Sequence, residues 1–189
     1  MRLLAFIFMT CFFVQLGNAQ EAETINWLTW EEAQEKLKEE PRKIFVDIYT
    51  DWCRFCEKMD LATFQKPHIV KYMNENYYAV KFNAEQTEDI VFNEKKYKFV
   101  QQGRRGYHEL AFAITRGQLS YPTIVFIDEE CNIIQPIPGF RDSMEFEKMM
   151  TYFGEDAHKE TPWSLYEKNY QPLRLKGNKD AKIVKEDCP

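Results

Sequence analysis

Several absences narrow the possible classes of protein. The chain of 189 residues has only 7 glycines and a net charge of −5, and it has no stripe of basic residues, no internal repeat and no low-complexity tract. Proteins that bind nucleic acid usually carry a basic surface, so no nucleic-acid partner is expected. We expect one soluble globular domain, which at this length buries about two-thirds of the surface of its unfolded chain.

Metal ligands are also scarce. The only histidines, His68, His108 and His158, are single and far apart in the sequence. A structural zinc site needs four Cys or His ligands at short, regular spacings. We therefore expect no metal ion.

The apolar run at the N-terminus is too short for a membrane span. It covers residues 3–14 and follows Arg2, whereas a spanning helix requires roughly 20 residues. The small residues Gly17-Asn18-Ala19 come next, which is typical of a signal peptide cleaved after Ala19. We interpret residues 1–19 as this peptide and the mature protein as periplasmic or secreted, with no stable membrane insertion. An uncleaved anchor is the alternative.

Four cysteines remain after such cleavage: Cys53, Cys56, Cys131 and Cys188. In an exported protein disulfides persist, and Cys53 and Cys56 are the natural pair. The sequence leaves open whether Cys131 and Cys188 pair with each other.

The residues before this pair form an apolar run with one anomaly. Lys43–Tyr49 is β-branched or aromatic at nearly every position, as in a strand buried on both faces, yet it contains Asp47. A buried carboxylate is costly unless it is paired or protonated, so Asp47 is either a liability or a tuned group. On a helix beginning near Trp52, Cys53 and Cys56 share one face. We interpret the two cysteines as a redox dithiol.

This order of features resembles the thioredoxin-like superfamily. A strand with a buried acid precedes Trp52-Cys53-Arg54-Phe55-Cys56, and Tyr121-Pro122-Thr123 follows much later. The resemblance runs from about Trp27 to Phe153 and is greatest to extracytoplasmic members with an insertion before that proline. It implies an α/β thioredoxin-like fold, with a mixed central sheet flanked by helices, a hairpin/helix insertion and a C-terminal extension. The domain is expected at residues 20–154, the insertion at about 84–120 and the extension, partly docked, at 155–189.

The resemblance also assigns catalytic roles. Cys53 attacks a substrate disulfide and Cys56 resolves the mixed disulfide. Asp47 exchanges protons with Cys56 through water, and Lys81 lies beside that acid. The alternative for Lys81 is an ordinary solvent-facing strand residue.

The position of Cys53 favours its thiolate. A helix macrodipole contributes roughly 0.3–1 kcal/mol, which is less than about one pKa unit. Arg54 adds a permanent positive charge, so we expect the pKa of Cys53 to lie below that of a free thiol. Arg54 and Phe55 differ from the dipeptides of thioredoxins and disulfide isomerases, which leaves the redox direction open. Leu61 replaces the proline that kinks this helix in thioredoxins.

Substrate contacts follow from the resemblance as well. Pro122 matches a cis-proline, Tyr121 before it offers its backbone to an extended peptide, and Gly139 leaves room for that peptide. Trp52 forms an apolar platform. The other expected substrate-binding residues are Arg54, Phe55 and Thr123. The alternatives are a trans Pro122 that begins a strand, and simple packing of Trp52.

Local patterns predict the remaining regular elements. Thr29 and Glu32 are spaced as a capping box for a helix that ends at Pro41. Further helices are expected at Pro67–Asn74 and Asp142–Phe153. A strand at Tyr77–Asn83 is expected to pair in parallel with the first one.

The predicted end of the sheet is a hairpin of Tyr121–Asp128 and Ile133–Pro138, in which the prolines place the second strand at an edge. Between residues 84 and 120 we expect a hairpin of Asp89–Phe92 and Tyr97–Val100, and a helix at Tyr107–Thr115. Arg104 and Arg105 are interpreted as part of a solvated loop, with a substrate-recruiting loop as the alternative.

Together these inferences predict an exported thiol–disulfide oxidoreductase. It exchanges disulfides with protein substrates, receives electrons from an upstream redox partner and uses no cofactor beyond the Cys53–Cys56 disulfide, with reduction favoured over oxidation. One alternative is a non-enzymatic binding module whose cysteines form a structural bridge. Another is a dedicated electron donor to a single partner.

Overall fold

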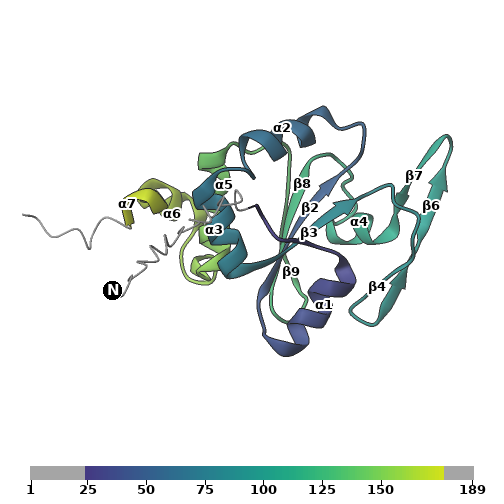
Figure 1. Cartoon of the computed structure of the whole chain (residues 1–189), viewed down its shortest axis with the longest axis horizontal. Coiled ribbons are helices and arrows are strands. Elements are labelled where there is room, and N and C mark those ends of the chain that lie inside the picture. The colour runs from purple at the N-terminus through teal and green to yellow at the C-terminus, as the bar shows by residue number, and fades with distance from the viewer. Residues whose placement is uncertain (1–23, 177–189) are drawn as a thin grey trace, which may run out of the picture.

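The structure is a computed structural model that describes residues 24–176 (Figure 1). The predicted signal peptide and Cys188 lie outside the described residues. Within residues 24–176, no helix combines the length and apolar character needed to cross a bilayer.

The core is a mixed sheet of five strands in the order β1-β3-β2-β8-β9. The strands are β1 (Trp27–Leu28), β2 (Lys43–Tyr49), β3 (Tyr77–Asn83), β8 (Thr123–Ile127) and β9 (Ile133–Pro138). β3 pairs in parallel with β1 and β2, while β8 pairs antiparallel with β2 and β9. The predicted mixed central sheet is confirmed. The bounds of β2 and β3 are those predicted.

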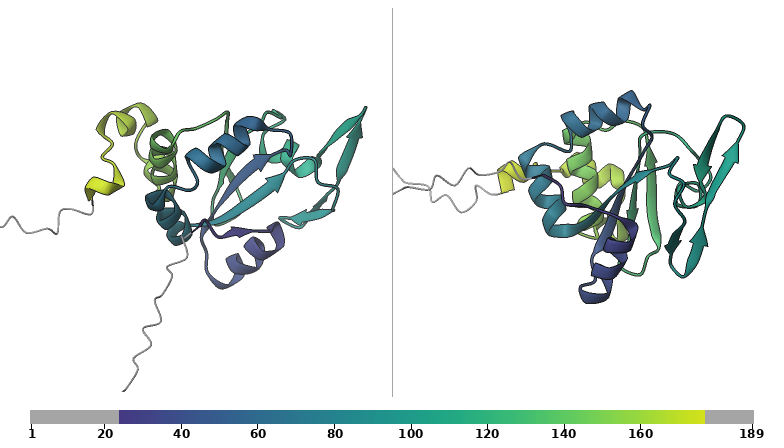
Figure 2. Two further views of the ribbon diagram at one scale, coloured as in Figure 1. Left: turned by 45° about the horizontal axis from the view of Figure 1, so that its top comes forward. Right: turned by 45° about the vertical axis from the view of Figure 1, so that its right-hand side comes forward.

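Helices cover both faces of this sheet (Figures 1 and 2). They are α1 (Trp30–Glu39), α2 (Arg54–Ala62), α3 (Pro67–Asn76), α4 (Glu109–Ile114), α5 (Ser143–Gly154), α6 (Trp163–Asn169) and α7 (Leu173–Lys176), with a short 3-10 turn at Ala157–Lys159. α1 and α4 pack on one face, and α2, α3 and α5 pack on the other. The predicted capping box at Thr29 is present, and Asp142 caps α5 in the same way.

Strand β2 separates the two layers of the core. Ile44, Val46 and Ile48 point to the α1 and α4 side, where they are fully buried. Phe45 points to the opposite side and packs against rings from several elements, including Phe64 and Phe146. Because side chains alternate along a strand, Asp47 shares the face of Phe45 and lies under the layer that contains α2.

The segment between β3 and β8 departs from the prediction. A first hairpin joins β4 (Ile90–Phe92) to β5 (Lys95–Tyr97) through a two-residue turn at Asn93-Glu94. The predicted second strand at Tyr97–Val100 is wrong, because the turn is shorter than expected and pairing begins at Lys95.

A second hairpin of β6 (Phe99–Gln102) and β7 (Arg105–His108) occupies the region interpreted as a solvated loop. Arg104 and Arg105 are exposed, as that interpretation expects, but the segment is a paired hairpin in which Arg104 lies in the turn and Arg105 begins β7. The interpretation is wrong in making the segment a loop. The helix after it, α4, begins at Glu109 because His108 is its N-cap, two residues later than the predicted start at Tyr107.

The C-terminal extension is docked by a buried carboxyl group. Glu147 of α5 is 2% exposed, and its Oε1 accepts hydrogen bonds from the hydroxyl of Tyr170 and the backbone N–H of Leu173, both at 2.7 Å. Its Oε2 lies 2.9 Å from Nε2 of His68 on α3. One acid thus holds α7 and α3 against α5.

Candidate active site

The two cysteines form a disulfide at the start of α2. Cys53 is the N-cap residue, its Cα lies 5.3 Å from that of Cys56, and its Sγ accepts a hydrogen bond from the backbone N–H of Cys56 at 3.1 Å. In this oxidised form Cys53 is 6% exposed and Cys56 is 3% exposed. The unpaired amides at a helix N-terminus favour a negative sulfur at Cys53. Arg54 begins the helix with its side chain in solvent. A lowered pKa of Cys53 in the reduced form stays a prediction.

Asp47 is a fully buried acid, 0% exposed. Its Oδ2 lies 2.7 Å from Nζ of Lys81, whereas its Oδ1 has no hydrogen-bond partner among the described residues. Burial raises the pKa of Asp47 from 3.8 to about 6, although the positive charge of Lys81 acts in the opposite direction. The structure places Lys81 beside Asp47, as the resemblance implies. The solvent-facing alternative for Lys81 is wrong, since only 22% of its side chain is exposed.

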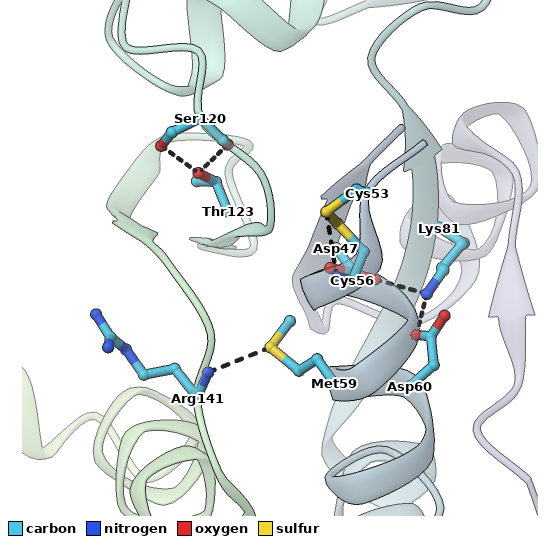
Figure 3. The surroundings of a disulfide bond; sticks show 9 residues. All are labelled: Asp47, Cys53, Cys56, Met59, Asp60, Lys81, Ser120, Thr123 and Arg141. Carbon is cyan, nitrogen blue, oxygen red and sulfur yellow. Dashed lines mark hydrogen bonds and ion pairs between the residues drawn. A yellow bond between two sulfur atoms is a disulfide. The ribbon is translucent and has the colours of Figure 1, made fainter. Parts of the chain in front are cut away.

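Lys81 also binds a second acid that sequence reasoning missed. Its Nζ contacts Oδ1 of Asp60, whose side chain is 40% exposed (Figure 3). Asp60 follows Cys56 by four residues on α2, so both lie on one side of the helix, and that spacing is the signal that marks it in the sequence. Although burial alone lowers the pKa of Lys81, the charges and hydrogen bonds of Asp47 and Asp60 raise it overall.

A cleft of about 550 Å³ reaches this cluster from the surface. Asp60 and Lys81 line it, together with aromatic residues that include Trp27 and Phe64. The ammonium group of Lys81 lies 5.1 Å from the ring centre of Trp27 and 5.6 Å from that of Phe64. Charged groups therefore form a continuous path from the buried Asp47 to solvent-exposed Asp60.

A turn before β8 lies across from the disulfide (Figure 3). The Tyr121–Pro122 peptide bond is cis, and the carbonyl of Pro122 accepts a hydrogen bond from the backbone N–H of Gly139 at 2.8 Å. Gly139 has a φ of +92°, which favours glycine, and the space a Cβ would enter there is open. The side chain of Thr123 is buried and donates a hydrogen bond to the carbonyl of Ser120, so it fixes this turn.

Trp52 stands beside the disulfide with half of its side chain in solvent. It is 50% exposed, and its Nε1 donates a hydrogen bond to Oε2 of Glu85 at 3.0 Å. The ring of Tyr121 meets it edge-on at 5.9 Å, and the guanidinium of Arg105 lies 4.3 Å from its centre. Phe55 adds a second exposed apolar side chain, 62% exposed. Sequence reasoning missed Glu85, and it singled out Arg105 without predicting its contact with Trp52, because nothing local links either residue to that ring.

Potential metal ligands are not gathered at any point of the described chain. Across residues 24–176, no group of three or more His, Cys, Asp or Glu side chains is arranged to hold a metal ion. Cys131 has no disulfide partner within the same range.

The model of the thioredoxin-like domain family matches residues 30–154. Curated relatives are distant: an uncharacterized protein of Caenorhabditis elegans is 25% identical over an alignment of 118 residues that covers 53% of this chain and 16% of that protein. Spermatogenesis-associated protein 20 of Mus musculus is 32% identical over 67 residues, which are 35% of this chain and 8% of that protein. The chain thus spans less than a fifth of the length of these two relatives.

Solved structures share the fold at low sequence identity. A thioredoxin-fold protein from Helicobacter pylori is 19% identical with a TM-score of 0.54, covering 68% of this chain and 83% of that one. DsbH oxidoreductase is 18% identical with a TM-score of 0.50, covering 78% of this chain and 94% of that one. A thioredoxin from Thermus thermophilus is 16% identical with a TM-score of 0.51, covering 69% and 87%. Since the family model covers well over half of the sequence, the chain belongs to the thioredoxin-like domain family.

Proposed function

We propose that this protein is an extracytoplasmic thiol–disulfide oxidoreductase that reduces disulfides in protein substrates. The observation that carries the proposal is the Cys53–Cys56 disulfide at the N-terminus of α2, above a buried acid that shares Lys81 with the same helix. A purely structural disulfide needs neither a helix N-terminus at its first sulfur nor an acid left with an unpartnered oxygen below it.

The reaction begins from the reduced dithiol. The thiolate of Cys53 attacks one sulfur of the substrate disulfide, so that one S–S bond breaks and a mixed disulfide forms. The other substrate sulfur leaves as a thiolate and takes a proton from water. Pro122 and Gly139 border the turn across from Cys53, where an extended substrate chain would lie.

The second step returns the protein to the form seen in the structure. Cys56 loses its proton to Asp47, and its thiolate attacks the sulfur of Cys53 in the mixed disulfide. The second substrate sulfur leaves and is protonated, and Cys53 and Cys56 form their disulfide. Two electrons have passed from the protein to the substrate. An upstream dithiol supplies two electrons and two protons to restore the reduced form, so no bound cofactor is needed.

Asp47 suits this proton transfer because of its environment. Its pKa of about 6 keeps it ionised and basic at neutral pH, while its burial favours the protonated form. Lys81 and Asp60 extend from it toward solvent, and they provide the route by which the proton leaves.

Export and protein partners complete the proposal. Residues 1–19 have the charge, apolar run and small residues of a signal peptide, which supports a periplasmic or secreted location. The exposed Trp52 and Phe55 beside the disulfide support a protein substrate, because they offer apolar surface to a chain that crosses the site.

The same exposed pair favours a second candidate. Cys53 is only 6% exposed in the disulfide, so the surface around it also suits a binding module that never exchanges electrons. Exchange with a small dithiol separates the two candidates, since a locked structural bridge resists it.

The test is reduction of the disulfides of insulin with dithiothreitol as the electron source. Cys53→Ser is expected to lower the rate to that of dithiothreitol alone, whereas Cys131→Ser, a matched change away from α2, keeps the activity. Equal rates for the wild type and Cys53→Ser would refute the proposal that the protein is an oxidoreductase. Equilibration of the Cys53–Cys56 dithiol with glutathione then shows whether the protein reduces or oxidises its substrates. A reduction potential of about −270 mV indicates a reductant, and one of about −120 mV indicates an oxidant.

A further inference from the structure

The hairpin of β6 and β7 contacts Trp52, the residue before Cys53, through Arg105. Arg105, the first residue of β7, places its guanidinium 4.3 Å from the centre of the Trp52 ring. Trp52 directly precedes Cys53, so Arg105 belongs to the rim of the site although it comes from a distant part of the sequence. The hairpin itself projects from the main sheet beyond α4 (Figures 1 and 2).

The hairpin is anchored at its base, so Arg105 is positioned rather than free. His108 donates its backbone N–H to the carbonyl of Ala84 at 2.7 Å, and its ring Nε2 lies 3.0 Å from the carbonyl of Glu88. Within the hairpin, the ring of Phe99 covers Gly106, where an added Cβ would come within 2.2 Å of it. The two strands are thereby packed tightly next to Arg105.

The contact with Trp52 leaves the N–H donors of Arg105 free to bind another group. A guanidinium contacts an aromatic ring with its flat face, while its N–H donors point outward in its plane and match a carboxylate. Among residues 24–176, no carboxylate pairs with the guanidinium of Arg105, and the same holds for its exposed neighbour Arg104 and for exposed Arg54.

Two acids close to Trp52 already accept hydrogen bonds. Glu85 accepts the hydrogen bond of the Trp52 ring, and Asp51 accepts one from Nδ2 of Asn83 at 3.1 Å. Although the protein has a net charge of −5, Arg54 beside Cys53 and Arg105 against Trp52 have no ion-pair partner among residues 24–176. Such a local charge attracts the opposite charge on an incoming chain.

We propose that Arg105 and Arg54 form a carboxylate-binding rim that selects substrates: extended polypeptides with acidic side chains next to the disulfide. Arg105 is the specificity-determining residue, because its contact with Trp52 holds the guanidinium against the residue that directly precedes Cys53. The inference rests on the proposed function, and it names the substrate class of that same dithiol.

The test compares two synthetic peptide disulfides of equal length. In one the cysteine is flanked by glutamates, and in the other by glutamines, which have nearly the same shape without charge. Each rate is divided by the rate of the same peptide with dithiothreitol alone, which removes intrinsic differences in reactivity. The wild type is expected to show a kcat/KM about two- to fivefold higher for each carboxylate that pairs with the rim. This preference should fall as the salt concentration rises.

Substitutions identify the arginine that causes the preference for the glutamate peptide. Arg105→Gln is expected to remove most of the preference for the glutamate peptide over the glutamine peptide, measured as the ratio of the two kcat/KM values. Arg174→Gln, the same change on exposed α7 at the opposite end of the molecule, is the matched control and keeps the preference. Arg104→Gln removes a charge from the same turn without touching the stacked guanidinium, so it is expected to have the smaller effect.

The possible results separate the proposed acid-binding rim from the proposed enzyme. Equal normalised rates for the two peptides, or an Arg105→Gln variant no different from Arg174→Gln, would overturn the proposal and leave the oxidoreductase intact. An effect of Arg104→Gln as large as that of Arg105→Gln would show that net charge alone selects the substrate. Failure of the wild type to reduce either peptide would refute the proposed function as well.

Discussion

Two buried carboxyl groups in this protein have very different surroundings. Glu147 is 2% exposed, and both of its oxygens have partners: Tyr170 and Leu173 at one, His68 at the other. Asp47 is 0% exposed, yet its Oδ1 has no partner in the described part of the chain, and its other oxygen shares Lys81 with Asp60.

The contrast indicates that Glu147 stabilises the fold, whereas Asp47 has the surroundings typical of a functional acid. A carboxyl group with all its hydrogen bonds satisfied stabilises the elements it joins, which for Glu147 are α3, α5 and α7. A carboxyl group that is buried with too few partners destabilises the fold, and such a cost is typical of functional sites. The two acids should therefore respond to substitution with opposite signs.

The largest effect is expected for Glu147→Ala. It leaves the partly buried hydroxyl of Tyr170 and the N–H of Leu173 without an acceptor, at a cost of roughly 2–4 kcal/mol in the free energy of unfolding. Urea denaturation measures this loss. Glu160→Ala, which removes an exposed acid of the same region, is the control. A Glu147→Ala variant as stable as this control would show that Glu147 is not an anchor.

Asp47→Asn should act in the opposite direction. Because the folded protein raises the pKa of Asp47 from 3.8 to about 6, wild-type stability falls as the pH rises through this range, and the full cost is present above it. Removing the charge is expected to stabilise the protein by on the order of 3 kcal/mol at pH 8 and by little at pH 4. The variant should also reduce insulin more slowly at neutral pH.

Urea denaturation at both pH values checks the sign. Glu147→Gln makes the same chemical change at the satisfied acid and should destabilise the protein. If Asp47→Asn also destabilised it at pH 8, the contrast between the two acids would be lost.

The smallest effect concerns Asp60. Its negative charge contributes to the raised pKa of Asp47, and without it Lys81 pairs with Asp47 alone. Both changes lower the pKa of Asp47, so Asp60→Asn should move the acid limb of the pH–rate profile down by less than about one pH unit. Glu57→Gln removes a charge from the same helix without touching Lys81, and it should leave the profile in place. An upward shift in Asp60→Asn would contradict the charge path.

Sequence patterns predicted the parts of the site that depend on continuous segments. The β-branched run from Lys43 to Tyr49 forms β2 with the predicted bounds, since nearly every side chain in it is buried. The position of Asp47 in that run also indicated a buried acid whose pKa is shifted, which the structure places there. The two cysteines and the cis Tyr121–Pro122 bond follow from motifs whose spacing is visible in the sequence.

The parts that were missed depend on contacts between distant segments. β6 and β7 carry polar residues at half of their positions and show no apolar alternation, so their pairing depends on the turn at Gly103-Arg104 and on the anchored base. The spacing of Asp60 from Cys56 is visible in the sequence, but its contact with Lys81 of β3 is not. Glu147 is buried where His68 of α3 and the C-terminal segment meet it.

The edges of the five-stranded sheet have a consequence for how the protein meets other chains. β1 offers only Trp27 and Leu28, and β9 contains Pro136 and Pro138, which have no N–H group to donate. An incoming chain therefore finds no long, regular edge of this sheet on which to add a strand. The five-stranded sheet should thus resist edge-to-edge association with a second copy of the protein.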